Sequence, residues 1–391
     1  MKIAGIISEY NPFHLGHARH IRLTREQAGA DIVVCIMSGC FVQRGEISCL
    51  PVDTRLRMAM DAGADLVFAL PAAGSLGDAE HFARWGTWLT DRLGCDILSF
   101  GAEEGSLTRL EHAASLLEHM SGPVREHLRA GLATGMSWAR AVSEAMGQDP
   151  DVQCLLERPN NILAISYLRA MQNLHLNIRP FSVERKGDYH DTSLAGSFPS
   201  ASAVRAALMR GDYAGVHIAC GTGYTFLQEA VRNGAYAAPN ALDQLLLYTL
   251  RTMPVPGPDM YRDAEEGLPQ LLKKHALTAP DRESLLRACV SARYPRARLS
   301  RLASRLLLDL PDIVCDALPA QAWLLGYRRQ ALPALREIGH RAEKNGVTVH
   351  GAAADITDIW MPAEIRAWDL RSLAVRENAG AALRHRVVVQ D

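Results

Sequence analysis

The chain has 391 residues, 48% of them hydrophobic and 22% charged, which is ordinary for a globular protein with a sizeable core. Its 42 basic and 43 acidic residues leave a formal net charge of −1, which excludes binding to nucleic acid or membranes through overall charge, so any such signal has to be local. Eight cysteines without a C-x-x-C pair argue against a disulfide framework or a zinc site. No apolar run approaches the roughly 20 residues of a membrane span. We expect a cytoplasmic protein without a protein-bound metal, a membrane partner or an obligate protein partner.

The first half of the chain alternates short apolar runs with helix-like segments. Strands are predicted at residues 2–8, 31–37, 64–70, 96–100 and 178–184. Helices are predicted at 16–28, 52–62, 78–93 and 161–173, with a helical excursion at 106–147. This alternation is typical of a parallel sheet that is covered on both faces and wound with right-handed crossovers. The fold class expected is therefore α/β, with a Rossmann-like domain over residues 1–210.

The strand signal fades beyond residue 210. Helices are predicted over residues 240–252, 263–276, 281–290, 296–309 and 318–344. The sequence therefore predicts a second, mostly helical domain over residues 211–391, which ends in a small mixed segment.

A basic segment lies within this second half. Residues 271–305 contain nine Lys and Arg but two acidic residues, and Tyr294 lies among them. The segment thus carries about 9 − 2 = +7 charges, and a basic stretch with an aromatic residue is typical of binding to an RNA or DNA backbone. The alternative is a solvated helix face, or arginines paired with acids from elsewhere. The candidate contacts are Lys273, Lys274, Arg293, Arg296, Arg298 and Arg301.

The most informative motif follows the first predicted strand. His14-Leu15-Gly16-His17 lies where that strand should give way to a helix, and nucleotides bind at this position in parallel α/β sheets. Two imidazoles can donate hydrogen bonds to a phosphate, and the helix N-terminus adds backbone N–H donors and a favourable dipole. The motif predicts attack on the α-phosphate of ATP, with His14 and His17 as the catalytic residues. The alternative is two structural histidines, one of which caps the helix.

A second group of candidates lies about 185 residues later. Ser200 and Ser202 begin a helix and could hold the β- and γ-phosphates of ATP through hydroxyls and backbone N–H groups. Arg205, one turn further, and Arg185 are candidates for carrying phosphate charge. Taken singly, such residues are more often helix caps and surface arginines. Mg²⁺ is expected on the triphosphate, held by phosphates and water rather than by a protein cage.

Three further loops contain candidate ligands. Gln43 and Arg44 follow the second strand and could bind a carboxylate substrate or a phosphate. Gly101 ends the fourth strand, where a glycine allows a nucleotide to approach the backbone closely. Asn160 and Asn161 open a helix, so one of them either contacts adenine or ribose or acts as a helix cap.

These residues resemble one family, the tRNA(Met) cytidine acetate ligases, which are bacterial members of the HxGH nucleotidyltransferase group. The resemblance spans nearly the whole chain. It rests on Ile6–His17, Met37–Glu46, Asp65–Pro71, Ala79–Ala83, Phe100-Gly101, Pro159–Leu163, Arg185, Tyr189-His190-Asp191, Ser200–Arg205, Glu266–Leu268, Arg293–Arg298 and Ile365–Leu370.

The resemblance implies a Rossmann-like nucleotidyltransferase domain and a two-step ligase. ATP and acetate would give acetyl-adenylate and pyrophosphate, and the acetyl group would pass to the exocyclic amine of the wobble cytidine of elongator tRNA(Met), giving N4-acetylcytidine. The basic second domain would hold the tRNA. The implied ATP contacts are Ile7, Ser8, Glu9, Tyr10, Asn11, Pro12, Phe13, His14, Leu15, Gly16, His17, Ala18, Arg19, His20, Gly101, Asn160 or preferably Asn161, and Arg185.

The chain departs from the family pattern at four places. Cys40 stands where the pattern has Asn, the stretch around Val52 lacks a Lys, Ala292 replaces a Lys, and Glu364 replaces an Asp. None of these changes removes the histidines or the Ser-x-Ser-x-x-Arg element. Two other interpretations stay open. A small-molecule adenylyltransferase would not need a basic helical domain, and a non-catalytic RNA-binding protein would leave His14, His17 and Arg205 without a role.

Overall fold

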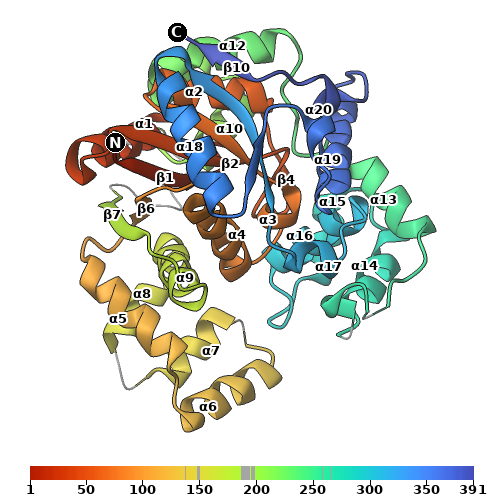
Figure 1. Cartoon of the computed structure of the whole chain (residues 1–391). Helices are drawn as coiled ribbons and strands as arrows, with labels where there is room; N and C mark the ends of the chain where they lie inside the picture. Colours follow the sequence, from red (N-terminus) through yellow and green to blue (C-terminus); the bar gives the residue numbers. More distant parts are fainter. Residues whose placement is uncertain (137, 148–149, 186–193, 195–198, 258, 265) are drawn as a thin grey trace.

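The computed structural model describes residues 1–136, 138–147, 150–185, 194, 199–257, 259–264 and 266–391 (Figure 1). Tyr189-His190-Asp191 lie outside the described residues. The centre is an eight-stranded sheet with the order β10-β8-β5-β2-β1-β6-β7, and β9 pairs with β8. Its strands are β1 Ile3–Ser8, β2 Ile32–Ser38, β5 Leu66–Leu70, β6 Ile97–Ala102, β7 Arg179–Glu184, β8 Gln321–Arg328, β9 Thr348–His350 and β10 Val388–Gln390. The five strands predicted in the first half are confirmed.

The sheet is mostly parallel and is covered on both faces. Strands β5, β2, β1, β6 and β7 pair in parallel, whereas β8 runs antiparallel to β5. Helices α1 Leu15–Ala28 and α2 Val52–Asp61 lie on one face, and α4 Ala79–Arg92 and α9 Pro159–Asn173 lie on the other (Figure 1). Right-handed crossovers require this, because the chain moves from β1 towards β5 and then crosses back to β6. The carboxyl ends of the parallel strands therefore meet at one edge, after β1, β2, β5 and β6.

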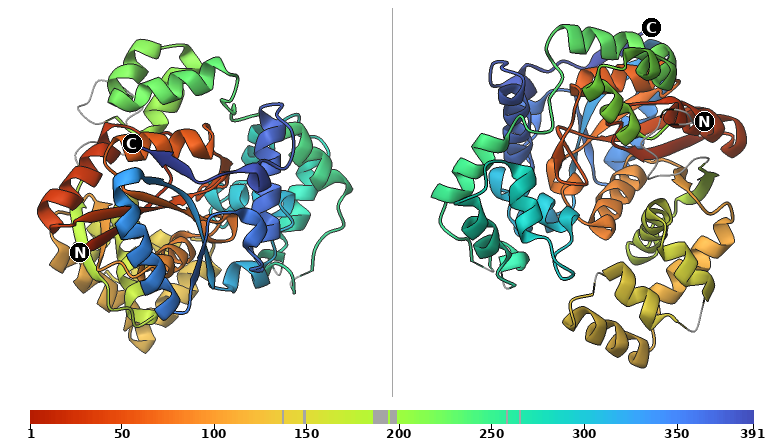
Figure 2. Two further views of the ribbon diagram at one scale, coloured as in Figure 1. Left: turned by 45° about the horizontal axis from the view of Figure 1, so that its top comes forward. Right: turned by 180° about the vertical axis from the view of Figure 1, so that it is seen from behind.

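A helical excursion joins β6 to β7, as expected. It comprises α5 Leu107–Glu118, α6 Gly122–Ala133, α7 Trp138–Ala145 and α8 Pro150–Leu156. Figures 1 and 2 show it, in yellow, as a lobe beside the β6–β7 edge of the sheet. Three helices follow β7 along the chain: α10 Ala201–Arg210, α11 Tyr213–Cys220 and α12 Tyr224–Arg232.

The helical bundle of the second half has its own hydrophobic core. It contains α13 Asp243–Thr252, α14 Leu268–Ala276, α15 Arg282–Cys289 and α16 Arg296–Leu307, close to four of the predicted helices. Its buried residues form a cluster between Leu246 and Leu306, while a larger cluster joins residues 3–237 with 308–388. The two cores divide the chain differently from the division expected at residue 210, because the last part of the chain packs on the sheet.

The helix predicted at residues 318–344 is wrong for its first half. Residues 321–328 form β8, inside the central sheet, and the helix α18 spans Leu332–Lys344. A short buried apolar run such as Trp323-Leu324-Leu325 has no periodicity that separates a strand from a helix. The chain then forms α19 Met361–Ala374 and α20 Ala381–Arg384 before β10, and α17 Asp312–Asp316 precedes β8.

Two sequence-level expectations concern the whole chain. No helix in the described part of the chain is both long enough and apolar enough to span a bilayer. All eight cysteines lie within the described residues as free thiols, and seven of them are buried.

Candidate active site

The His-x-Gly-His motif forms the N-terminus of α1. His14 is the N-cap residue, and the Gly16 N–H donates to its Nδ1 at 3.1 Å. In return, the His14 N–H donates to Nδ1 of His17 at 3.3 Å. These two bonds form a reciprocal capping box, which satisfies backbone donors that a helix N-terminus leaves unpaired. The capping role considered as an alternative is therefore present, but it occupies only one nitrogen of each ring.

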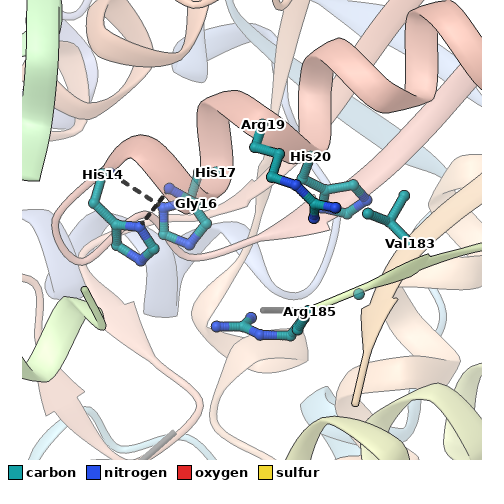
Figure 3. A pocket seen from close by; sticks show the side chains of 8 residues that line it. His14, Gly16, His17, Arg19, His20, Val183 and Arg185 are labelled. Atoms are coloured by element: carbon teal, nitrogen blue, oxygen red, sulfur yellow. Dashed lines mark hydrogen bonds between the residues drawn. The ribbon is translucent and has the colours of Figure 1, made fainter. Parts of the chain in front are cut away.

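The capping bonds fix which nitrogen of each ring carries the proton. Because backbone N–H groups donate to Nδ1 of His14 and of His17, each neutral ring carries its hydrogen on Nε2. The two rings lie side by side, with centroids 3.8 Å apart and planes inclined by 30°. Figure 3 shows their free nitrogens pointing to the side where Arg185 lies. The motif thus presents two Nε2–H donors to one space.

Both rings are uncharged at neutral pH. Burial, with a smaller contribution from the nearby Arg185 guanidinium, lowers the pKa of His14 to about 3. Burial also holds the pKa of His17 well below its usual value, with smaller contributions from His14 and Arg185. Desolvation disfavours the charged form of an imidazole, and a neighbouring cation acts in the same direction. The histidines therefore act as neutral donors, and the positive charge of this region comes from arginine.

A pocket of about 450 Å³, including space open to solvent, lies in front of these donors. Its lining residues are His14, Gly16, His17, Arg19, His20, Gly101, Val183 and Arg185 (Figure 3). This set contains two guanidinium groups and no carboxylate, and it lies at the N-terminus of a 14-residue helix. Arginine forks, backbone N–H groups and a helix N-terminus all favour an anion. The lining is therefore suited to a phosphate chain.

Neighbouring polar contacts hold the pocket walls in place. The Arg19 guanidinium donates to the Glu184 carbonyl at 2.8 Å. Nε2 of His20 lies 2.9 Å from the Ser99 hydroxyl, and that hydroxyl lies 2.7 Å from the hydroxyl of Thr24. Burial lowers the pKa of His20 to about 3, so this ring is also neutral. The contacts fix α1 against β6 and β7, the two strands that form the other wall.

Gly101 makes room for Arg185. The register of β6 and β7 pairs Gly101 with Val183, two residues before Arg185. A Cβ atom at residue 101 would lie 3.2 Å from both Cγ and Cδ of Arg185, closer than such contacts normally are. The structure thus brings Gly101 and Arg185 together beside the motif histidines. Val183 was missed from the sequence, although the period of two along a strand indicates that it shares a side with Arg185.

Asn160 and Asn161 do not line this pocket but bind Glu103 and Glu104, which follow β6. The Asn161 side-chain oxygen accepts from the Glu104 N–H at 2.9 Å, and the Asn161 N–H donates to the Glu103 carboxylate at 2.9 Å. The side-chain amide of Asn160 also donates to Glu103. The Glu103 carboxylate thus caps α9 and attaches it to the end of β6. The N-cap residue is Arg158, so neither asparagine has the helix-cap role considered as an alternative. A contact of either asparagine with ATP stays a prediction.

The Ser-x-Ser-x-x-Arg element lies against the turn that precedes the motif. Ser200 is the N-cap of α10 and accepts from the Ala203 N–H at 3.1 Å. The Arg205 guanidinium donates to the Asn11 carbonyl at 2.5 Å and to the Ser202 hydroxyl at 3.3 Å. Two segments about 190 residues apart in sequence are therefore side by side. Neither serine lines the pocket described above, and their phosphate contacts stay predictions.

The turn before the motif, residues 9–13, is buried and anchored at several points. Tyr10 has φ of 48°, and its hydroxyl lies 3.2 Å from Sγ of Cys35. The Asn11 side chain accepts from the Cys49 N–H at 2.8 Å. Tyr10, Asn11 and Phe13 are all at most 5% exposed. The resemblance implies these three residues as ATP contacts. Because their side chains are buried, they also hold the turn in its conformation.

Arg55, which sequence analysis missed, binds this turn through its guanidinium group. Its side chain is fully buried. The guanidinium donates to the carbonyls of Glu9 at 2.7 Å and Ser38 at 2.9 Å, and also to the Gly39 carbonyl. One side chain therefore joins the segments that leave β1 and β2. An arginine on an amphipathic helix carries no sequence signal for such a role.

Gln43 and Arg44 lie in a small hairpin rather than on the pocket lining. The hairpin pairs β3 Phe41–Val42 with β4 Glu46–Ile47. The Gln43 N–H donates to the Glu9 carboxylate at 2.6 Å, and its side-chain amide donates to the Gly77 carbonyl at 3.2 Å. Arg44 is exposed at the tip. Binding of a carboxylate substrate by these two residues stays a prediction.

Several cations of the basic segment already bind other groups of the protein. Arg298 pairs with Asp263 and Glu266, and Arg296 pairs with Glu283. The Lys273 ammonium donates to the carbonyls of Arg251 and Met253 at the end of α13. Arg301 is half-buried, and burial lowers its pKa. Lys274 and Arg293 are exposed. Pairing with acids, considered as an alternative, therefore applies to part of the segment.

Comparison with known proteins agrees with this geometry. The family model described as HIGH Nucleotidyl Transferase matches residues 1–384. The tRNA(Met) cytidine acetate ligase of Syntrophotalea carbinolica is 35% identical over 326 residues, which cover 82% of this chain and 77% of that protein. A protein of the same name from Clostridium perfringens is 29% identical over 391 residues, with 95% of each chain covered.

Solved structures share the fold over the full length of the chain. Crystal structures of Thermotoga maritima TmcAL, one apo and one bound with alpha-thio ATP, match with TM-scores of 0.90 and 0.89. Each covers 100% of both chains at 22% identity. From the family model and the sequence relatives, the chain belongs to the HIGH nucleotidyltransferase family and, within it, to the tRNA(Met) cytidine acetate ligases.

Proposed function

We propose that this chain activates acetate with ATP as acetyl-adenylate and transfers the acetyl group to the exocyclic amine of the wobble cytidine of elongator tRNA(Met). The observation that carries the proposal is the pair of neutral imidazoles at the N-terminus of α1. Their Nε2–H groups face a pocket that also contains Arg19 and Arg185. Such a lining binds a polyphosphate and leaves two uncharged donors for the reacting phosphate.

In the first step, an acetate oxygen attacks the α-phosphorus of ATP while the bond to the β-phosphate oxygen breaks and pyrophosphate leaves. Negative charge grows on the non-bridging oxygens of the α-phosphate. His14 and His17 donate to these oxygens through Nε2–H, and fixed donors of this kind favour the transition state. Arg19 and Arg185 hold the leaving phosphates. The arrangement works mainly by positioning and electrostatics.

In the second step, the cytidine amine attacks the acetyl carbonyl, the carbonyl–phosphate bond breaks and AMP leaves. The amine nitrogen loses one proton and the product is N4-acetylcytidine. The helical bundle of α13–α16 holds the tRNA, with Lys274 and Arg293 among its exposed cations. Such side chains bind phosphates and make affinity depend on salt. A tRNA substrate also favours a cytoplasmic location.

Mg²⁺ fits this site as a companion of ATP. Among the described residues, no three His, Cys, Asp or Glu side chains form a cluster that could hold a metal ion. Mg²⁺ readily keeps water and phosphate ligands instead of an all-protein cage. The protein residues of the pocket therefore bind the phosphates rather than the metal.

The test is transfer of radiolabelled acetate to bulk bacterial tRNA with ATP and Mg²⁺, followed by nucleoside analysis. We expect label in N4-acetylcytidine. Acetate-dependent release of pyrophosphate without transfer would retain the adenylation step and contradict the tRNA acceptor. Absence of both reactions would contradict the proposal, and adenylyl transfer to a small molecule would become the leading alternative.

A further inference from the structure

The β3–β4 hairpin, residues 41–47, connects the nucleotide half of the molecule to the helical bundle. Its strands pair Phe41 with Ile47 and Val42 with Glu46. On one side it contacts the turn at residues 9–13, and on the other it contacts α15 and α16. The hairpin therefore joins the two hydrophobic cores at the carboxyl edge of the sheet.

Three donors of the bundle, one half-buried and two buried, converge on the hairpin tip. The Arg282 guanidinium donates to the Gly45 carbonyl and, at 2.6 Å, to the Ser300 hydroxyl. Ser300 donates to the Arg44 carbonyl at 2.6 Å, and Ser304 donates to the Gly45 carbonyl at 2.7 Å. Ser300 and Ser304 are 4% and 5% exposed. The two serines lie one helical turn apart on the buried face of α16.

The close approach requires glycine at the tip. Gly45 has φ of +72°, a conformation that favours glycine. A Cβ atom there would lie 2.5 Å from the Arg301 nitrogen and 2.6 Å from the Ser300 oxygen, both backbone atoms of α16. Helix backbone cannot move aside as a side chain can. The tip is therefore seated directly on the backbone of the bundle.

The same hairpin also contacts the turn at residues 9–13. The Gln43 N–H donates to the Glu9 carboxylate at 2.6 Å. Glu46 forms an ion pair with Arg205 at 4.0 Å, and Arg205 donates to the Asn11 carbonyl at 2.5 Å. A shift of the tip would be transmitted to both contacts, because the hairpin has only three residues between its strands.

We propose that Arg282, Ser300 and Ser304 are positioning residues for adenylation, which hold the hairpin so that the turn before His14 keeps its reactive geometry. This inference rests on the proposed function. Arg282 belongs to the basic segment by sequence, but it points into the protein and does not serve tRNA binding. The bundle is thus required for a step in which tRNA takes no part. Misplacement of a catalytic group by about 1 Å can cost on the order of 100-fold in rate.

The test compares Arg282→Met with Arg287→Met in acetate-dependent exchange of pyrophosphate into ATP without tRNA. Arg287 lies on the same helix but is exposed, with 75% of its side chain accessible. We expect Arg282→Met to lower kcat by about 10- to 100-fold and Arg287→Met to leave it within about twofold. Arg282→Lys should recover part of the loss, since a lysine can still donate to the Gly45 carbonyl.

Two further readouts separate positioning from misfolding and from RNA contact. Titration with alpha-thio ATP should still show one site per chain for Arg282→Met, because the pocket histidines and arginines remain, whereas misfolded protein would lower this stoichiometry. The tRNA affinity of Arg282→Met in filter binding should stay within about twofold of wild type.

Ser304→Ala removes one hydroxyl and should lower kcat about threefold, as expected when one net hydrogen bond is removed.

Wild-type exchange in both Arg282→Met and Ser304→Ala would overturn the inference, as would loss of tRNA affinity with exchange intact. If the wild type itself catalyses no acetate-dependent exchange, the proposed function fails instead. In that case the inference is decided by alpha-thio ATP affinity, which Gly45→Ala should weaken at least threefold and Arg287→Met should not. Equal affinity in Gly45→Ala and wild type would then overturn it.

Discussion

At the scale of single residues, the backbone decides what the motif histidines can do. His14 and His17 each use Nδ1 as an acceptor for a backbone N–H, and burial keeps both rings neutral. A charged imidazolium would need protons on both nitrogens, which the capping bonds oppose. The structural and the catalytic interpretation of the motif are therefore compatible, because they concern different nitrogens of the same rings.

Because Nδ1 of His17 caps the helix and Nε2 faces the pocket, two substitutions of His17 should differ in exchange activity. An asparagine places an amide oxygen near the former Nδ1 and keeps the bond to the His14 N–H, but it lacks a donor at the position of Nε2. We expect His17→Asn to lower kcat of pyrophosphate exchange by about 100- to 1,000-fold, as expected for loss of one transition-state donor. Its Tm should stay within a few degrees of wild type.

His17→Gln is the matched control, because its longer side chain brings an amide N–H close to the former Nε2. It should retain more exchange activity than His17→Asn, and its Tm should also stay close to wild type, because a glutamine at this helix position can accept from the His14 N–H. Exchange at the wild-type rate in His17→Asn would contradict the assigned role. The exchange assay and thermal unfolding, run on the same preparations, decide both points.

At the scale of elements, much of the architecture follows from local pattern and the rest from contacts distant in sequence. Strands β1, β2, β5 and β6 are predictable because each is a short buried apolar run. Strand β7 lies at the edge of the sheet, and of its six residues Val183 alone is buried. Strand β8 is not predictable, because its run resembles a buried helix until it pairs with β5. Likewise the motif turn is local, whereas Arg55 and Glu364 act on partners 46 and 292 residues away.

Glu364 shows how such a distant contact stabilises the site. Its fully buried carboxylate accepts from the Ala72 N–H at 2.7 Å and from the Trp368 indole at 3.0 Å. It thus ties α19 to α3, Ala72–Ser75, which begins where β5 ends. Burial raises the pKa of Glu364 to about 7.

That shift predicts a specific pH dependence of stability. The carboxyl group titrates near 4.5 when unfolded and near 7 when folded, so its contribution is fully present below pH 4.5 and is lost as the pH rises to 7. The loss amounts to about 3 kcal/mol, at about 1.4 kcal/mol per pKa unit. Glu364→Gln cannot titrate and lacks this dependence.

Urea unfolding of wild type and Glu364→Gln at pH 4.5 and pH 7.5 measures the effect. The glutamine variant should gain stability relative to wild type by about 3 kcal/mol between the two conditions, whatever its difference at pH 4.5. A difference that does not change with pH would show that the buried carboxyl titrates at its ordinary value.

At the scale of the whole molecule, we propose different tasks for two surfaces of the bundle. One faces the hairpin and contains Arg282, and the other contains Lys274 and Arg293, two of the exposed cations. Arg296 and Arg298 are neutralised by acids of the bundle. The net charge of a segment therefore overstates its capacity for phosphate, because paired arginines release few counterions from RNA.

The salt dependence of tRNA binding tests this distinction. We expect Lys274→Ala with Arg293→Ala to weaken binding and to lower the slope of log affinity against log salt by about 1 for each phosphate that the protein no longer neutralises. Acetate-dependent pyrophosphate exchange should not change, because both side chains lie outside the nucleotide pocket. Arg22→Ala with Arg329→Ala, two exposed arginines outside the bundle, serves as the control and should retain the wild-type slope. An unchanged slope in the bundle variant would move the RNA site elsewhere, and equal effects of both pairs would show that binding follows total charge rather than this surface.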